Sequence, residues 1–245
     1  MINGRAIMKN NWKKSLSIIV PVFNEEEAVV KTVSELRATF FESKIIVIDD
    51  GSTDASSKQL SSLKGIKLIR HEKNRGYGAS WKSGVSAART EYVAFYDADG
   101  QFIPGDLEEM AEIAITKSID LISGNRKIFQ NVPLARIPGK LVLHKFAEFL
   151  INQKIEDLNC GLRVFRKEAL EAQIDLLPNG FSASTTSLLV FLKNGNSVEF
   201  KKISFLKRKG KSSVSIIKDG INTLRLITSL TLLLDPTRVF SIMTF

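Results

Sequence analysis

Short apolar runs and longer amphipathic stretches alternate along the first half of the chain. Residues 16–22 (LSIIVPV) form a continuous β-branched run, which is typical of a buried strand. The next apolar positions, Val29, Val33 and Leu36, recur at the spacing of one helical face. Continued along the chain, the pattern predicts strands at 16–22, 44–48, 66–69, 92–96 and 121–123 and helices at 25–40, 55–63, 77–89 and 107–116. This alternation predicts an α/β fold, in which helices cover both faces of a mostly parallel central sheet.

The second half of the chain is less regular. Its apolar pattern predicts helices at 141–151 and 185–193, strands at 162–165 and 197–206, and a long helix at 214–234. The sequence has no internal repeat, low-complexity segment or proline-rich linker. We therefore expect one domain at residues 1–213 and a C-terminal extension at residues 214–245, formed by an amphipathic, juxtamembrane helix.

The 245 residues have an ordinary globular composition, with 44% hydrophobic and 25% charged residues, which excludes a disordered or collagen-like chain. The single cysteine, Cys160, excludes an intramolecular disulfide framework and a zinc site made only of cysteines. No signal peptide is predicted, and no stretch reaches the ~18 apolar residues of a membrane span. We expect the apolar residues after Arg238 to be either the first turns of a truncated span or a short tail packed on the domain.

The chain carries a formal net charge of +9, from 35 Lys and Arg against 26 Asp and Glu. Basic residues gather between Lys201 and Lys211. Such a cluster is consistent with a solvated face, a nucleic acid, or an anionic lipid or phosphate ligand. Because no nucleic-acid-binding motif accompanies it, we expect no nucleic-acid partner.

Acidic residues directly follow three of the predicted strands, at 24–25, 49–50 and 97–99. In a parallel sheet the carboxyl ends of the strands share one edge, and ligands bind there. A D-x-D triplet alone is common at strand ends, but acidic clusters at one edge repel each other unless a cation compensates. The carboxylates of Asp97 and Asp99 can reach one hard cation, and Gln101 adds an oxygen ligand. The sequence favours Mg²⁺ or Mn²⁺, which would neutralise a diphosphate.

The acidic segment at 49–54 has a structural and a chemical interpretation. Ser52 or Asp54 is expected to cap the helix that follows. Capping does not need Asp50, whose carboxylate could accept a hydrogen bond from a nucleobase.

Residues 74–78 resemble a phosphate-binding glycine loop, but Trp81 occupies the third glycine position of the dinucleotide fingerprint. We therefore expect Gly76 and Gly78 to permit close packing at the start of a helix. The two histidines of the chain have no partner pattern and are expected to be structural; they are His71 and His144.

The ordered set of motifs is more specific than any of its members. The set consists of VPVFNEE at 20–26, DDGSTD at 49–54, NRGYGA at 74–79, DADGQ at 97–101, GNR at 124–126 and DLNCGLR at 157–163. In order and spacing it resembles family 2 glycosyltransferases of the GT-A fold, over about residues 16–240. The nearest likeness is to the dolichol-phosphate mannose synthase branch and its bacterial polyprenyl-phosphate relatives. The resemblance implies a Rossmann-like GT-A domain and a metal-dependent hexosyltransferase.

The resemblance also implies roles for individual residues. The residues implied to line the donor's base and ribose are Pro21, Phe23, Glu25, Ile48 and Asp50. The residues implied to hold the nucleotide-sugar are Asp97, Ala98 and Asp99, together with Arg126 and Arg208 at the phosphates. The implied metal ligands are Asp97, Asp99 and Gln101, and the implied catalytic residues are Asp99, Arg126 and Asp157. The residues implied to meet the acceptor phosphate are Arg208, Lys209, Lys211 and Ser212.

Two positions depart from the family pattern. Phe23 stands where a tyrosine is common, which removes a hydroxyl from the base site. The basic motif of the family often ends in Ser-Lys, whereas Ser212 and Ser213 follow Lys211 here, so that Lys209 or Lys211 would have to substitute.

The resemblance implies inverting transfer of a sugar from a UDP- or GDP-linked donor to a dolichyl or undecaprenyl phosphate. The implied place is the cytoplasmic face of a membrane, with the helix at 214–234 and the basic cluster against anionic lipid. Family members with a membrane hairpin place it after a segment like 235–240. The chain could also associate with copies of itself as a homo-oligomer.

Three alternatives stay open. The acceptor could be a glycan or lipopolysaccharide hydroxyl, with Asp157 as the general base, whereas with a phosphate acceptor Asp157 would organise the acceptor side. The chain could be an inactive nucleotide-sugar-binding module, although the intact 97–101 motif argues against this. A nucleotidyltransferase is less favoured, because the first strand leads into Asn24 and Glu25 rather than into a glycine-rich loop followed by arginine.

Overall fold

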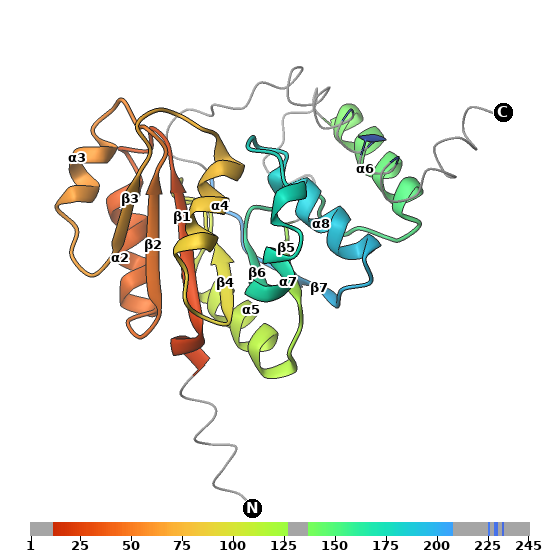
Figure 1. Cartoon of the computed structure of the whole chain (residues 1–245), viewed down its shortest axis with the longest axis horizontal. Helices are drawn as coiled ribbons and strands as arrows, with labels where there is room; N and C mark the ends of the chain where they lie inside the picture. The colour runs from red at the N-terminus through yellow and green to blue at the C-terminus, as the bar shows by residue number, and fades with distance from the viewer. Residues whose placement is uncertain (1–11, 127–136, 208–224, 226–227, 230–231, 233–245) are drawn as a thin grey trace, which may run out of the picture.

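The computed structural model describes residues 12–126 and 137–207 and four further positions, 225, 228, 229 and 232. Its centre is a seven-stranded sheet in the order β3-β2-β1-β4-β6-β5-β7 (Figure 1). The strands are β1 (Leu16–Val22), β2 (Lys44–Asp49), β3 (Lys67–Arg70), β4 (Tyr92–Phe95), β5 (Leu121–Asn125), β6 (Arg163–Arg166) and β7 (Val198–Lys202). Strand β6 runs antiparallel to β4 and β5, and the other four pairings in the described part of the chain are parallel. The predicted mostly parallel α/β sheet is confirmed.

Helices cover both faces of this sheet, as predicted. Helices α2 (Val29–Thr39) and α5 (Pro104–Lys117) pack on one face. Helices α4 (Tyr77–Ala87) and α8 (Ala183–Lys193) pack on the other, and α6 (Ile137–Ile151) lies against α8 on the outside (Figure 1). The shorter helical segments are η1 (Trp12–Ser15), α3 (Ser56–Ser61), α7 (Lys167–Glu171) and η3 (Ile174–Leu176).

The two covered faces explain the continuous apolar run of β1, which is buried at all seven positions. Ile18 and Val20 belong to the core beneath α2 and α5, whereas Ile19 belongs to the core beneath α4 and α8. A strand that is buried on both faces needs apolar side chains at successive positions, rather than an alternation of apolar and polar ones.

The reversed direction of β6 determines which loops meet. Arg163 pairs with Phe95 of β4 on one side and with Ser123 of β5 on the other. The amino end of β6 therefore lies at the edge where the other strands have their carboxyl ends. The segment before β6 meets the segments after β4 and β5 there.

Some element boundaries differ from the prediction. The helix expected from Glu25 begins at Val29, and a turn at residues 26–28 precedes it. The strand expected to reach Leu206 ends at Lys202 as β7. Helix α6 begins four residues before the predicted start, and α7 was not predicted because it spans only five residues.

The predicted helix at 214–234 lies outside the described residues except at four positions, all of which are helical. The division into a domain and a C-terminal extension therefore stays a prediction. Among the residues that the structure describes, no helix is both long and apolar enough to cross a membrane.

Candidate active site

The predicted site residues that the structure describes gather at the carboxyl edge of the sheet. Five strand ends supply them: β1, β2, β4, β5 and the amino end of β6. Pro21 and Ile48 are buried register partners in β1 and β2, and Phe23 and Glu25 follow β1 and are partly exposed. Sequence reasoning therefore placed the residues of this edge correctly, although they come from distant parts of the chain.

The loops after β1 and β2 are bonded to each other. Asn24, which has a φ of +56°, accepts a hydrogen bond from the Thr53 N–H at Oδ1 (2.8 Å), and its own N–H donates to Ser52 Oγ (3.1 Å). Asp54 Oδ2 accepts from the Glu26 N–H (3.1 Å). The expected capping role of Asp54 is confirmed, because its Oδ1 atom accepts from the Ser56 N–H (2.9 Å) at the first residue of α3, although Ala55 stands between them. Ser52 and Asp54 also join the two loops.

Asp50 follows β2 and is 3% exposed. Its Oδ1 atom lies 2.6 Å from His71 Nδ1 and accepts from the Arg75 N–H (2.9 Å), while Oδ2 accepts from the Gly76 N–H (2.8 Å). The other ring nitrogen of His71, Nε2, lies 2.8 Å from Ser83 Oγ. These contacts agree with a structural role for His71. Because each carboxylate oxygen has about two acceptor positions, Oδ2 can accept one further donor, such as a nucleobase N–H.

The start of α4 packs directly against the 178–180 loop. The N–H groups of Gly78 (2.7 Å) and Ala79 (3.1 Å) both donate to the Asn179 carbonyl. A Cβ atom on Gly78 would lie 2.0 Å from the Pro178 carbonyl oxygen. A Cβ atom on Gly76, where φ is +102°, would lie 2.4 Å from the Asn179 carbonyl oxygen. The expected close approach at these two glycines is confirmed. A protein carbonyl occupies the helical N–H groups that a phosphate would need.

The loop after β4 is tied to two other elements. Ala98 is buried, and its carbonyl accepts a hydrogen bond from Thr32 Oγ1 of α2 (3.1 Å). Asp99 is 6% exposed, and its Oδ1 atom accepts from the Gln101 N–H (3.1 Å). Gln101 exchanges two further hydrogen bonds with Leu206, from Leu206 N–H to the Gln101 carbonyl (2.8 Å) and from Gln101 Nε2 to the Leu206 carbonyl (3.1 Å).

The oxygen atoms of this loop fit a divalent cation that binds together with a second molecule. Asp97, Asp99 and Gln101 offer hard oxygen ligands, which suit Mg²⁺ and Mn²⁺. The described residues contain no group of three His, Cys, Asp or Glu side chains that could hold a metal. A metal here would therefore need oxygen atoms from a ligand, and a diphosphate supplies them.

Arg126 and Asp157 form a two-pronged ion pair beside this loop. Arg126 Nε donates to Asp157 Oδ2 (2.7 Å), Nη2 donates to Oδ1 (2.9 Å), and the Arg126 backbone N–H also donates to Oδ2 (3.1 Å). The side chains are 23% and 8% exposed, respectively. The ring of Phe205 lies 5.1 Å from Arg126 Cζ, within cation–π range.

Both members of this pair are charged at neutral pH. Burial raises the pKa of Asp157, but the hydrogen bonds and charge of Arg126 lower it by more, so that the pKa lies below its ordinary value. Burial lowers the pKa of Arg126, but the carboxylates of Asp157 and Asp97 contribute to a net rise. A carboxylate with a low pKa and both oxygens engaged is a poor proton acceptor, so the geometry favours Asp157 as an organiser over Asp157 as a base.

The residues expected at the acceptor phosphate are not described by the structure: Arg208, Lys209, Lys211 and Ser212. The structure does describe Lys207, the residue just before them. Lys207 follows Leu206, which is hydrogen-bonded to Gln101. The basic segment therefore begins beside the loop that carries Asp99.

Three residues of this edge were missed by sequence reasoning. Tyr77 donates its hydroxyl hydrogen to Asp97 Oδ1 (2.6 Å), and Phe205 covers Arg126. Arg163 is fully buried and donates to Ser187 Oγ (2.9 Å), and burial lowers its pKa to about 10. Tyr77 lies inside a motif that was noticed for its glycines, and Arg163 ends the 157–163 motif, but Phe205 carries no local signal.

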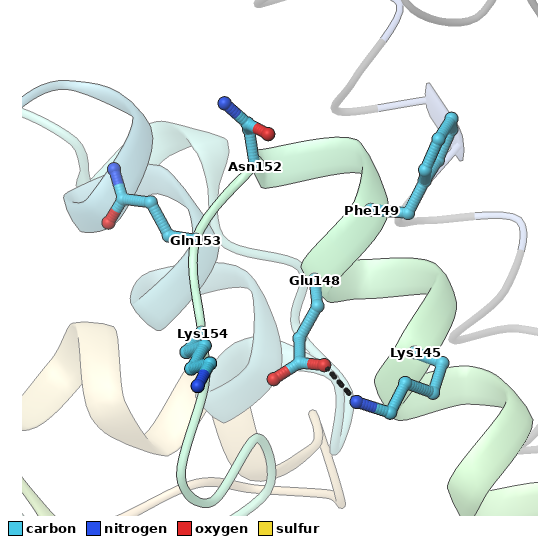
Figure 2. Close-up of a pocket in the computed structure, with 6 residues that line it drawn as sticks. All are labelled: Lys145, Glu148, Phe149, Asn152, Gln153 and Lys154. Atoms are coloured by element: carbon cyan, nitrogen blue, oxygen red, sulfur yellow. Dashed lines mark hydrogen bonds and ion pairs between the residues drawn. The ribbon is translucent and has the colours of Figure 1, made fainter.

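A separate surface hollow lies at the end of α6 (Figure 2). Its lining residues are Lys145, Glu148, Phe149, Asn152, Gln153 and Lys154. Lys145 Nζ lies 2.8 Å from Glu148 Oε2, and Glu148 also lies 3.5 Å from His144 Nε2. None of the predicted site residues lines this hollow, and two of its charged groups, Lys145 and Glu148, are paired with each other.

The carboxylates and the arginine lie at the carboxyl edge of an open α/β sheet, where enzymes with such sheets bind their ligands. Residues 17–173 match the sequence profile of Glycosyl transferase family 2. The chain belongs to this family and is a glycosyltransferase, as the sequence motifs predicted.

Several characterised relatives are similar over most of the chain. The UDP-N-acetylglucosamine–dolichyl-phosphate N-acetylglucosaminyltransferase of Methanococcus voltae is 28% identical over 205 residues, which cover 74% of this chain and 81% of the relative. The polyprenol monophosphomannose synthase of Mycolicibacterium smegmatis is 28% identical over 222 residues, which cover 83% of each chain.

The fold is shared with solved glycosyltransferase structures. The glucosyl-3-phosphoglycerate synthase of Mycobacterium tuberculosis, in complex with Mn²⁺, UDP-glucose and phosphoglyceric acid, superposes with a TM-score of 0.72 at 16% identity. The match covers 88% of this chain and 79% of that one. The likeness confirms the expected GT-A fold.

Proposed function

We propose that this glycosyltransferase moves a sugar from a nucleoside diphosphate donor to a polyprenyl phosphate, with inversion at the anomeric carbon. An oxygen atom of the acceptor phosphate attacks the anomeric carbon. The bond from that carbon to the diphosphate breaks, and the nucleoside diphosphate leaves with the electron pair. The relatives named as dolichyl-phosphate and polyprenol-phosphate enzymes support this acceptor class.

The state of Asp157 is the observation that carries the proposal. Its carboxylate is held by Arg126 through two side-chain hydrogen bonds, and its pKa is lowered. A hydroxyl acceptor would need a base to remove its proton, and Asp157 is poorly suited to that task. A phosphate acceptor is already anionic near pH 7 and needs no base.

The donor would be held by the loops after β1, β2 and β4. Asp50 Oδ2 has acceptor capacity for the N–H of a uracil or guanine base, which supports a UDP- or GDP-linked sugar. Asp97, Asp99 and Gln101 would hold Mg²⁺ or Mn²⁺, which would neutralise the charge of the leaving diphosphate. Arg126 would add its own positive charge to the same site.

The proposed acceptor implies where in the cell the enzyme acts. A polyprenyl tail resides in a bilayer, so that the carboxyl edge would face the membrane surface, which we propose to be the cytoplasmic face. The positive charge of the chain supports attraction to anionic lipid. Binding to vesicles that contain anionic lipid should be strong at low salt and weak at high salt.

The test compares two acceptors that share one tail. Undecaprenyl phosphate and undecaprenol would each be incubated with the full chain, Mn²⁺ or Mg²⁺, and UDP- or GDP-linked hexoses, and the products would be identified by mass spectrometry. We expect a glycosylated phosphate from one nucleotide class and no product from undecaprenol. The anomeric proton coupling of the product then reports inversion.

Transfer to undecaprenol or to a water-soluble glycan at a comparable rate would overturn the proposed acceptor. Asp99→Asn serves as the matched control. Because it removes one proposed metal ligand, it should abolish a genuine metal-assisted reaction and leave a contaminating activity untouched.

A further inference from the structure

We infer that Tyr77 is a positioning residue of the donor site: its hydroxyl fixes the Asp97 carboxylate in the orientation in which it meets the metal and diphosphate of the donor. The inference deepens the proposed function and rests on it. The sequence motifs assigned Tyr77 no role at the donor or the metal.

The first observation is the way Asp97 is held by two neighbours. The Tyr77 hydroxyl donates to Asp97 Oδ1 over 2.6 Å. Next to this hydroxyl, a Cβ atom on Gly161 would lie 2.3 Å from Asp97 Oδ2 and 3.0 Å from the Tyr77 hydroxyl oxygen. The backbone before β6 therefore approaches Asp97 as closely as a glycine permits. One orientation of the carboxylate satisfies both neighbours.

The second observation is that Tyr77 is itself fixed. Its ring stacks on Phe181, with centroids 5.8 Å apart and planes inclined by 21°, and lies 5.4 Å from the ring of Trp81. Tyr77 is the first residue of α4, and the next N–H, that of Gly78, is bonded to the Asn179 carbonyl. A ring held between two aromatic side chains cannot turn away without losing these contacts. The hydroxyl therefore has a defined position before any ligand binds.

The chemistry of the pair fits this role. A phenol can donate a hydrogen bond, whereas an ionised carboxylate can only accept one. The Tyr77 hydroxyl is therefore the donor, and Asp97 Oδ1 is the acceptor. Fixing a ligand-binding carboxylate in advance removes the entropy cost of orienting it when the ligand arrives.

Binding is the direct readout of this inference. Mn²⁺ with UDP and Mn²⁺ with GDP would be titrated calorimetrically into the full chain and into Tyr77→Phe, which keeps the ring and removes the hydroxyl. Outer-shell partners of metal ligands contribute roughly 10–100-fold to affinity, and we expect Tyr77→Phe to weaken binding by that factor. The matched control is Tyr92→Phe, the same chemical change at a buried tyrosine where β4 begins, far from Asp97. It should bind like the unmodified chain.

A double-mutant cycle tests whether Tyr77 acts through Asp97. In an Asp97→Asn background, Tyr77→Phe should cause little further loss, whereas a full additional loss would overturn the inference. Gly161→Ala is a second variant, because its Cβ would press on Asp97 Oδ2 and on the Tyr77 hydroxyl without removing either group, and it should also weaken binding.

The outcomes separate this inference from the proposed function. If the unmodified chain binds and Tyr77→Phe binds within about twofold of the Tyr92→Phe control, the inference is overturned and the proposed function stands. If the folded, unmodified chain binds none of the diphosphates, the proposed function fails and the inference fails with it.

Discussion

His71 Nδ1 lies 2.6 Å from Asp50 Oδ1, and both side chains are buried. The pair joins the end of β2 to the residue after β3. Through Ser83, at 2.8 Å from His71 Nε2, it also joins both to α4. Asp50 thus organises the protein around it before any nucleotide binds, and the carboxylate that we propose to bind the base is part of the internal framework.

Replacing His71 by alanine should destabilise the fold. Asp50 would lose one of its buried partners, and a buried group left without a partner costs about 1–3 kcal/mol. The free energy of unfolding from urea titrations measures this loss. His144→Ala is the control, because Glu148, the carboxylate beside it, lies 3.5 Å away and is partly exposed. Equal stabilities of the two variants would contradict the role assigned to His71.

Gly78→Ala should be among the most damaging single-methyl additions. The new Cβ would lie 2.0 Å from the Pro178 carbonyl oxygen, so that α4 or the 178–180 loop must move. We expect a loss of about 1–3 kcal/mol, the range for overpacking, in a thermal or urea unfolding experiment. Gly105→Ala in α5 adds the same methyl where no atom lies within 4 Å, and it should be neutral or slightly stabilising. A harmless Gly78→Ala would show that the two segments are not in tight contact.

Asp157→Asn should lower stability at neutral pH but not in acid. The pKa of Asp157 is lowered in the folded state, so its stabilising contribution is present above the unfolded pKa and is lost as pH falls through the folded value. We expect a deficit of roughly 2–4 kcal/mol near pH 7, where Arg126 loses its charged partner, and a much smaller one below pH ~3. Unfolding measured at both pH values checks this, and a deficit independent of pH would contradict the ion pair.

The same variant separates two roles in catalysis. If Asp157 organises the site, activity lost in Asp157→Asn will not return when the pH is raised. Recovery at alkaline pH, where a hydroxyl acceptor loses its own proton more readily, would instead identify Asp157 as the base.

Metal and nucleoside diphosphate should bind together rather than separately. Since no three-residue metal cluster occurs among the described residues, Mn²⁺ alone should shift the thermal unfolding midpoint little. Mn²⁺ with the matching diphosphate should raise it, by about 2.7 kcal/mol of added stability at 100-fold over the dissociation constant. A comparison of UDP, GDP, CDP and dTDP, each with Mn²⁺ or EDTA, identifies the base. A full shift with the diphosphate in EDTA would contradict the metal ligands.

Much of the fold and site was predictable because its signals are local. The seven buried residues of β1 appear as a continuous apolar run, and the carboxylates of Asp97 and Asp99 follow β4 directly. The carboxyl ends of parallel strands lie at one edge of a sheet, whatever the details of packing. Residues that directly follow such strands in the sequence are therefore expected to lie near one another in the fold.

Other features depend on contacts between distant segments. The direction of β6 cannot be read from four residues, because it depends on how the preceding connection returns to the sheet. The partner of the Tyr77 hydroxyl lies 20 positions away, on another element. The segment before α2 is held by Ser56, 31 positions on, whose Oγ accepts from the Glu25 N–H.

The reversal of β6 has a consequence for how this enzyme can diverge. Arg126 and Asp157 are 31 positions apart, yet their ion pair brings both ends of the intervening segment to the same edge. A segment that leaves and returns at one place can change in length at little entropic cost, since that cost grows only with the logarithm of loop length. Insertions or deletions there would leave the strand pairings intact. The chain between these two residues is therefore a place where evolution or protein engineering can add residues while the strands that carry the site loops stay unchanged.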